Sequence, residues 1–299
     1  MKTNTFASFK RSIDFLIFSN IFVSLCAASL SHATIIILQI TAGFYTSLFV
    51  FFSTLSVYNF QRILVSEKNE TVAFLSTRHR WIIQNQKILT AITAISIIAS
   101  IFIYLFYFSN KHNIFLLLFP FSLLALWYVV DIRKFFPFIK GRIRPLRTLP
   151  YLKIALISIT WTAITVWLVV IESGLALLSV SVLLISLERL LFIFAITLPF
   201  DIRDMEQDQA MNIKTVPIML GENKTKQLAY GVLILFSLLS ALRITLIPGI
   251  PMITVALVTS ALLTIYIVSL SGSDKSEYYY SALVESTMII QFLLLFLMT

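Results

Sequence analysis

The stretch Thr197-Leu-Pro-Phe-Asp-Ile-Arg-Asp-Met-Glu-Gln-Asp-Gln-Ala-Met-Asn-Ile-Lys-Thr-Val-Pro-Ile-Met-Leu-Gly221 ends a long apolar run with a group of acids. It contains Asp201, Asp204 and Asp208, which are three and then four residues apart. At about 100° per residue, this spacing places the three carboxylates within about 60° of one another around an α-helix. Like charges at helical spacing repel, so the group costs stability unless a cation lies among them. The stretch therefore predicts a cation site where an apolar helix ends.

The chemistry of this acidic group favours a hard metal ion. Mg²⁺ typically binds one or two carboxylates together with phosphate oxygens and waters, so we expect Asp201, Asp204 and Asp208 to be Mg²⁺ ligands. The alternative is a solvated acidic cap that follows a membrane helix. The surrounding pattern favours the metal site, because an apolar helix leads in through Pro199 and Asn212 can adopt the left-handed conformation that ends a helix.

The composition of the whole chain is that of a membrane protein. Its 299 residues are 59% hydrophobic and only 12% charged, and the mean hydropathy is +0.92, which excludes a soluble globular domain. The net charge of +9 could indicate nucleic-acid binding. That class is excluded because the basic residues lie in short loops between apolar runs, where they orient a membrane protein. Cys26 is the only cysteine, so no intramolecular disulfide forms.

Nine apolar runs are long enough to cross a membrane as helices. We expect them at about 14–31, 34–58, 87–109, 112–130, 149–171, 175–200, 227–247, 250–270 and 279–298. The first run resembles a signal peptide that ends at Ser31-His32-Ala33, but another apolar run follows at once, so we interpret it as a retained span. The predicted fold class is an all-α, polytopic membrane protein that forms a single domain over residues 1–299.

Lysine and arginine are distributed very unevenly between the two sides of this predicted arrangement. With the N-terminus placed in the cytoplasm, 20 of the 23 basic residues fall on the cytoplasmic side and only Lys111 falls on the other. Such an excess is the positive-inside signal of integral membrane proteins. It predicts a protein of the inner (cytoplasmic) membrane whose polar loops, and the acidic stretch among them, face the cytoplasm.

Three polar connections would then share one face: residues 59–87, 131–153 and 201–226. Together they could form an anion-binding entrance above an apolar cavity, with metal-binding carboxylates and basic side chains for a diphosphate and apolar walls for a lipid tail. The alternative for the basic loops is that they only set topology and attract anionic lipid headgroups.

The pattern Asp201-x-x-Asp204-x-x-x-Asp208, followed by Lys214-Thr-Val-Pro-x-x-Leu-Gly221, resembles the second aspartate-rich motif of the UbiA superfamily of intramembrane prenyltransferases. The nine-span plan is similar too, as are the Tyr128 region after the fourth span and Tyr278-Tyr-Tyr-Ser281 at the ninth. The resemblance implies an all-helical fold around a central cavity. It also implies Mg²⁺-dependent transfer of an isoprenyl group from its diphosphate to a lipophilic or aromatic acceptor, within membrane lipid and without nucleic acid.

The first aspartate-rich motif of that family is degenerate in this chain. It should end the second span, where the sequence reads Tyr58-Asn-Phe-Gln-Arg-Ile-Leu-Val-Ser-Glu67. Asn59 matches and Glu67 could replace the last aspartate, but Phe60 and Ile63 stand where carboxylates belong. Arg62 lies one turn from Asn59 and could supply fixed positive charge, because a guanidinium binds phosphate without a metal.

We therefore expect Asp201, Asp204 and Asp208 to be catalytic and to hold the metal. The expected substrate-binding residues are Asn59, Arg62, Glu67, Tyr128, Arg147, Lys153 and Lys214. Two other functions remain open at this point. A terpene cyclase or diphosphate lyase could use the same scaffold, and a non-catalytic membrane protein could bind or transport a lipid or quinone.

Overall fold

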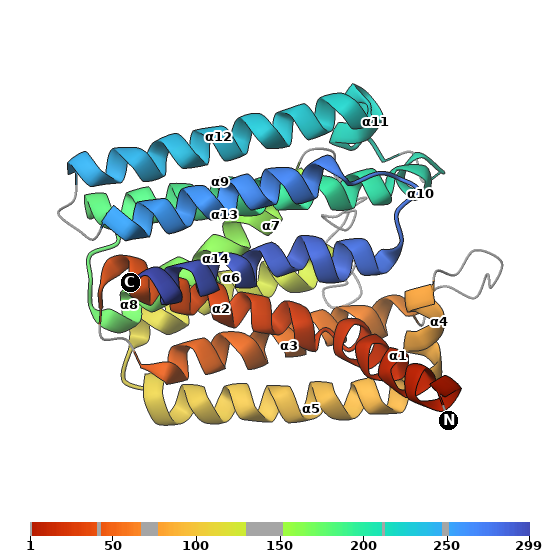
Figure 1. Ribbon diagram of the computed structural model, residues 1–299. Helices are drawn as coiled ribbons and strands as arrows, with labels where there is room; N and C mark the ends of the chain where they lie inside the picture. Colours follow the sequence, from red (N-terminus) through yellow and green to blue (C-terminus); the bar gives the residue numbers. More distant parts are fainter. Residues whose placement is uncertain (1, 41–42, 67–76, 130–151, 211–212, 247–250) are drawn as a thin grey trace, which may run out of the picture.

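Helices make up the structure of this protein. The computed structural model describes residues 2–40, 43–66, 77–129, 152–210, 213–246 and 251–299, and these ranges contain no β-strand. The long helices lie side by side in one bundle (Figure 1). The predicted all-α class is therefore confirmed.

In chain order the helices are α1 (Lys2–Phe18), α2 (Ile21–Leu38), α3 (Phe44–Ser66), α4 (Thr77–Gln84), α5 (Gln86–Ile103), α6 (His112–Val129), α7 (Leu152–Thr162), α8 (Leu168–Ser173), α9 (Val180–Arg203), α10 (Met205–Ala210), α11 (Val216–Leu220), α12 (Glu222–Leu246), α13 (Pro251–Ser269) and α14 (Glu285–Met298). Three π-helical segments extend α5 (Tyr104–Phe108), join α7 to α8 (Ala163–Trp167) and precede α14 (Tyr279–Val284). Segments of this kind occur frequently at functional sites.

Seven helical segments in the described ranges are long and apolar enough to cross a membrane. They are Ile21–Leu38, Gln86–Phe108, Leu152–Ser173, Val180–Arg203, Glu222–Leu246, Pro251–Ser269 and Tyr279–Met298. The remaining two predicted spans correspond to α3 and α6, which are not among these seven. The structure thus has a helix at each expected position, and seven of these meet the requirement for a span.

The predicted boundary between the first two spans is wrong. Ser31, His32 and Ala33 lie inside α2, which continues to Leu38. The buried Ser31 hydroxyl donates to the Ala28 carbonyl at 2.8 Å, so its polar group is satisfied without a break in the helix. The breaks instead follow Phe18 and Leu38, next to Asn20 and Gln39, whose φ angles of 61° and 52° are left-handed.

Charged side chains inside the bundle are paired or hydrogen-bonded. Glu188 on α9 forms a buried ion pair with Arg243 on α12. The neighbouring Arg189 donates to Gln291 Oε1 on α14 and to the Leu30 carbonyl on α2, each at 3.1 Å. Intramembrane charges usually face the interior and find partners in this way.

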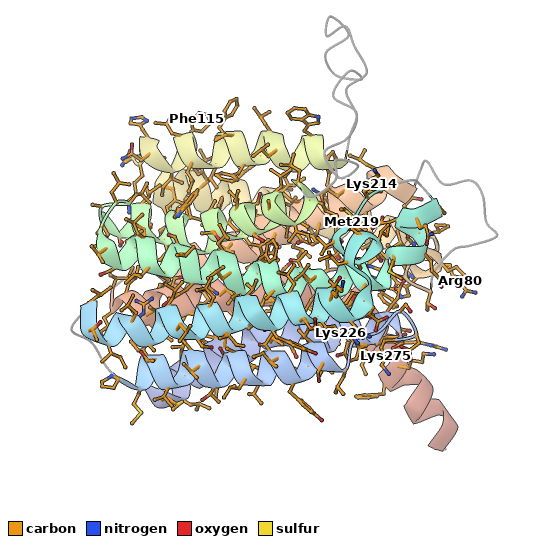
Figure 2. The ribbon with its side chains drawn as sticks, turned by 90° about the horizontal axis from the view of Figure 1, so that it is seen from above. Arg80, Phe115, Lys214, Met219, Lys226 and Lys275 are labelled. Carbon is orange, nitrogen blue, oxygen red and sulfur yellow. The ribbon has the colours of Figure 1, made fainter. Side chains whose placement is uncertain are left out.

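One end of the bundle collects the polar segments, and we call it the polar end. The short helices α4, α10 and α11 lie there, next to the end of α9 (Figure 1). Arg80, Lys214, Lys226 and Lys275 lie at this end, while Phe115 lies toward the other (Figure 2). The two termini lie at opposite ends of the bundle (Figure 1). The predicted grouping of the acidic stretch with basic residues at one end is therefore present.

Candidate functional site

The three aspartates lie on two consecutive helices rather than on one. α9 ends at Arg203, Asp204 forms the turn, and α10 begins at Met205. Asp204 has φ −85° and ψ 1°, a conformation that ends regular helix. Its carbonyl accepts a hydrogen bond from the Asp208 N–H at 2.8 Å, which holds the short α10 against the end of α9.

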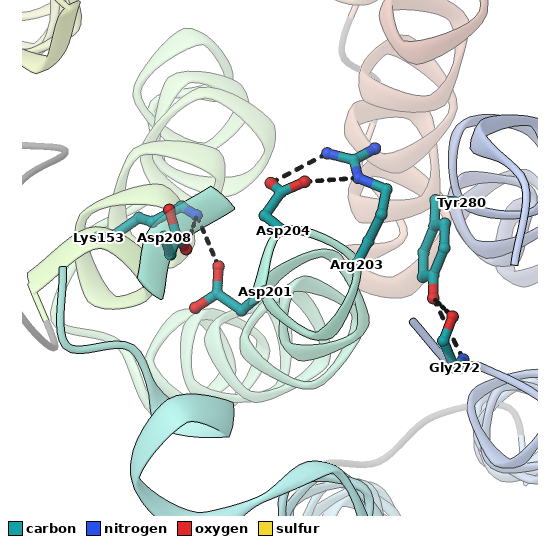
Figure 3. A network of polar contacts seen from close by, with 7 residues as sticks. All are labelled: Lys153, Asp201, Arg203, Asp204, Asp208, Gly272 and Tyr280. Atoms are coloured by element: carbon teal, nitrogen blue, oxygen red, sulfur yellow. Dashed lines mark hydrogen bonds and ion pairs between the residues drawn. The ribbon is translucent and has the colours of Figure 1, made fainter. Parts of the chain in front are cut away.

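Lys153, in the first turn of α7, reaches the first and third aspartates. Its Nζ lies 2.7 Å from Asp201 Oδ1 and 3.9 Å from Asp208 Oδ2 (Figure 3). All three side chains are largely withdrawn from solvent, with 19% of Lys153, 2% of Asp201 and 13% of Asp208 exposed. The cation that the acidic spacing requires is therefore, in this structure, an ammonium group from another helix.

Asp204 has a different partner. Its Oδ1 lies 2.7 Å from Arg203 Nε and its Oδ2 lies 3.1 Å from Arg203 Nη2, a bidentate pair (Figure 3). The same guanidinium lies over the rings of Phe200, at 5.3 Å, and of Tyr280, at 5.6 Å. Tyr280 is fixed in turn, since its hydroxyl donates to the Gly272 carbonyl at 2.6 Å. Arg203 is thus held between an acid and two aromatic faces.

The charge of Asp204 is set by these neighbours. Burial alone would raise the pKa of this carboxyl, but Arg203, followed by Lys153 and Arg62, holds the pKa below its usual value. These neighbours therefore favour the ionised form of Asp204.

The donor chemistry of the aspartates suits a hard divalent ion, but the described residues do not form a ready-made metal cage. No group of three or more His, Cys, Asp or Glu side chains within the described ranges is close enough to hold a metal ion. Lys153 lies between Asp201 and Asp208, and Arg203 holds Asp204. Binding of Mg²⁺ at all three carboxylates requires at least Lys153 to move.

A second group of predicted residues lies on α3, close to the aspartates. Asn59 is completely buried and bonds to Asn20, which also binds Arg78 from α4. Arg62 is close enough to Arg203 to be repelled by it electrostatically. Sequence reasoning did not identify Asn20, although a buried asparagine inside an apolar run is a usable signal.

The other predicted substrate-binding residues are not placed at the aspartates by the described structure. Lys214, between α10 and α11, is exposed. Glu67 and Arg147 lie outside the described residues, and of Tyr128 only its position on α6 is described. Their roles stay predictions. Arg203, which sequence reasoning did not single out, has the closest contact with Asp204, and its position between acids at the end of an apolar helix could have indicated this.

Comparison with solved structures identifies the fold. A UbiA homologue from Archaeoglobus fulgidus bound to GPP and Mg²⁺ matches with a TM-score of 0.65 and 12% identity, over 95% of this chain and 99% of that one. The same homologue bound to DMAPP and Mg²⁺ matches with a TM-score of 0.61 and 11% identity, over 95% and 98%.

A digeranylgeranylglyceryl phosphate synthase matches with a TM-score of 0.58 and 17% identity, over 97% of this chain and 98% of that one. No protein-family model and no curated protein sequence matches the chain. The chain has the fold of these UbiA homologues over nearly its whole length, and the resemblance seen in the sequence is confirmed at the level of the fold.

Proposed function

We propose that this chain, which has the fold of the UbiA homologues, transfers an isoprenyl group from an isoprenyl diphosphate to a lipophilic or aromatic acceptor within the membrane. The observation that carries this proposal is the inward position of the aspartates: Asp201 and Asp208 are buried at the polar end, and Asp204 is partly buried against Arg203. An acidic cap in water would leave these carboxylates exposed.

The ligands of the similar structures support the same substrate class. GPP and DMAPP are isoprenyl diphosphates, and both are bound together with Mg²⁺ in the Archaeoglobus fulgidus homologue. In this chain Asp201, Asp204 and Asp208 are the residues that would hold Mg²⁺. When bound, the ion supplies Lewis-acid stabilisation of the charge on a leaving diphosphate.

The cations of the chain itself provide the rest of the charge stabilisation. Lys153, Arg203 and Arg62 lie close to the aspartates and are largely buried, where fixed positive charges act more strongly than in water. Breaking the carbon–oxygen bond of the substrate leaves an allylic cation, which the electron pair of the acceptor captures with loss of a proton. Burial keeps water from capturing that cation first.

Two aromatic side chains lie inside the bundle near the aspartates and their basic partners. Trp161 on α7 donates from Nε1 to the hydroxyl of Tyr58 on α3 at 3.2 Å, and Tyr58 directly precedes Asn59. Aromatic faces stabilise cations in a water-poor environment. This pair is our choice for the wall that contacts the isoprenyl chain.

The test is turnover by membranes that contain the protein. With labelled C10 to C20 isoprenyl diphosphates, Mg²⁺ and a panel of acceptors, we expect release of pyrophosphate and transfer of the label. Asp201→Asn and Asp204→Asn should reduce the rate by a factor of at least about 100, the loss that removal of one electrostatic stabiliser typically causes. Glu206→Gln, an exposed acid of α10, is the matched control and should leave the rate unchanged.

The products separate this function from the two alternatives. Release of pyrophosphate without an acceptor, together with a hydrocarbon or an alcohol, would identify a cyclase or a diphosphate lyase. If no isoprenyl diphosphate is consumed but isoprenoid lipids copurify with the protein, the chain is a binding protein and the transfer proposal is wrong.

A further inference from the structure

Three buried polar side chains join α3, α4 and the junction between α1 and α2. Arg78 Nη2 donates to Asn20 Oδ1 at 2.8 Å, and Asn20 Nδ2 donates to Asn59 Oδ1 at 2.7 Å. The direction of this chain of hydrogen bonds is fixed by its first member, because arginine can only donate. Asn20 must therefore accept with its oxygen and donate with its nitrogen. Asn59 must accept in turn, which leaves its Nδ2 as a donor.

Two donors in this chain have no partner. Within the described part of the protein, Asn59 Nδ2 and Arg78 Nε are buried and make no hydrogen bond. Asn59 is 0% exposed and Arg78 only 7% exposed, so water does not take the place of a partner easily. Buried donors are normally satisfied, and those that are not call for a ligand, an ion or strain as their explanation.

The surroundings of these donors are rich in positive charge. Burial, followed by the charges of Arg62 and Arg203, lowers the pKa of Arg78 to about 9, so the guanidinium remains charged at neutral pH. Arg62 lies one turn after Asn59 on α3 and is itself repelled by Arg203. We call Arg62, Arg78 and Arg203 the arginine cluster. Like charges brought together under burial are stabilised when an anion lies among them.

Two carboxylates also act on the arginine cluster. Glu277 lowers the repulsion felt by Arg62 and Arg78, and Glu285 at the start of α14 acts on Arg78. They balance part of the positive charge. Carboxylates accept hydrogen bonds, yet Arg78 Nε and Asn59 Nδ2 remain without an acceptor. Glu277 Oε2 is itself a buried acceptor without a partner, so the carboxylates balance part of the charge but do not, where they lie, accept from Arg78 Nε or Asn59 Nδ2.

We propose that Asn59 and the arginine cluster form a metal-independent half-site that binds a phosphate group of the isoprenyl diphosphate directly. The proposal rests on the proposed function for the identity of the anion. A phosphate group fits because it offers several acceptor oxygens at once, and guanidinium groups bind phosphate in a bidentate, charge-assisted manner. Arg203 connects the two halves of the site, since it also holds Asp204.

The experiment measures binding of inorganic pyrophosphate without any divalent ion. The full-length protein, purified in detergent, is titrated with pyrophosphate in the presence of EDTA by isothermal calorimetry. We expect saturable binding to the wild type, and Arg78→Met should weaken it about 10- to 100-fold, the loss typical of a hydrogen bond to a charged group. The matched control is Arg80→Met, an exposed arginine on the same helix (Figure 2), which should bind as the wild type does.

Two further variants keep the test decisive if Arg78→Met does not fold. Asn59→Asp has nearly the same shape but replaces the unpartnered donor by an acceptor, so it should also lose pyrophosphate binding. Arg78→Lys keeps the charge without the planar fork and should bind more weakly than the wild type. Folding of each is followed by thermal unfolding. The proposal is overturned if the wild type fails to bind pyrophosphate in EDTA, or if the folded variants bind it equally well.

The phosphate could also belong to a lipid headgroup, and a second arm separates the two sources. The protein is placed in nanodiscs of phosphatidylcholine, with or without phosphatidylglycerol. If the anionic lipid raises the melting temperature of the wild type but not of Arg78→Met, and pyrophosphate does not, the cluster binds lipid and the diphosphate assignment is wrong. Stabilisation by pyrophosphate in both kinds of nanodisc supports the assignment.

Failure of this inference can be told apart from failure of the proposed function. If the protein transfers the label but its affinity for pyrophosphate does not change when Arg78 or Asn59 is replaced, the proposed function is supported and the half-site is wrong. If the protein binds pyrophosphate in a way that depends on Arg78 but consumes no isoprenyl diphosphate, the half-site is supported and the proposed function is wrong.

Discussion

Lys153 is the residue whose position changes the interpretation of the acidic stretch most. From the sequence it is one of several basic residues expected to contact the substrate. In the structure its ammonium group instead lies between Asp201 and Asp208, and these two acids share a partner that comes from α7. Lys153 thus supplies the positive charge that two buried carboxylates need when no other cation is bound.

Replacement of Lys153 by methionine should therefore make the stability of the protein depend on an added cation such as Mg²⁺. In EDTA we expect Lys153→Met to lose about 3 kcal/mol of stability, because two buried acids are left without a counter-charge. Mg²⁺ should raise the melting temperature of the variant more than that of the wild type, since the ion no longer competes with an ammonium group. Thermal unfolding in EDTA and in Mg²⁺ measures both effects.

The control for this prediction is Lys275→Met. Lys275 is exposed and its ion pair with Asp274 is open to solvent, so the variant should unfold as the wild type does in both buffers. If Lys153→Met is unaffected by EDTA, or if Mg²⁺ stabilises it no more than the wild type, the ammonium group does not occupy the metal position.

α9 is the element that links the site to the interior of the bundle. Its last turn carries Asp201, and three to four turns earlier it carries Glu188, which pairs with Arg243 on α12. Both side chains of that pair are buried. Removal of one partner from a buried pair leaves an uncompensated charge, whereas removal of both leaves an apolar contact.

The pair between α9 and α12 predicts a strongly non-additive result. Arg243→Met should cost about 3–5 kcal/mol, because Glu188 would remain buried without its partner. The double variant Glu188→Leu/Arg243→Met should recover most of that loss. Thermal unfolding of the single and double variants in detergent checks the prediction. A double variant as unstable as Arg243→Met would mean that the pair contributes through packing rather than through its charges.

The arrangement of the whole molecule predicts which parts meet each side of the membrane. The termini lie at opposite ends of the bundle (Figure 1), and the polar end collects the basic residues. The positive-inside pattern predicts that this end faces the cytoplasm. Because the single native cysteine, Cys26, is buried, cysteines introduced at the two ends can be labelled without background.

We expect a membrane-impermeant maleimide to label His112→Cys, at the end opposite the polar one, in intact cells. Lys275→Cys, at the polar end, should be labelled only after the membrane is opened. Both positions are exposed in the structure, and the wild type, with Cys26 alone, should stay unlabelled. The opposite pattern would reverse the predicted orientation, and labelling of both positions in intact cells would contradict a bundle that crosses the membrane.

Much of the fold was predictable because membrane helices depend on local composition. The run that forms α13 contains no charged residue, and a helix satisfies all of its backbone groups within the segment, as lipid requires. The boundary between the first two spans was not predictable in this way. Ser31 looks like a break in the sequence, and only its hydrogen bond inside α2 makes it compatible with a continuous helix.

The sequence predicted where the acidic group lies, at the end of an apolar helix, but it did not predict which basic side chain pairs with which acid. Asp201, Asp204 and Asp208 stand out as a group of acids after an apolar run, although the structure divides them between the end of α9 and α10 instead of one helix face. Arg203 and Lys153 could not be assigned to separate aspartates from the sequence. That choice depends on where α7 begins relative to the end of α9, which is a matter of packing between helices.

The sequence by itself determined that this chain is an all-helical membrane protein with a concentrated acidic group at the end of one helix, because hydropathy and periodicity are properties of short segments. Only the tertiary structure decided which charges meet. Asn20, Asn59 and Arg78 come from three separate elements, and the two donors left without a partner exist only because burial among those elements removes both water and alternative acceptors.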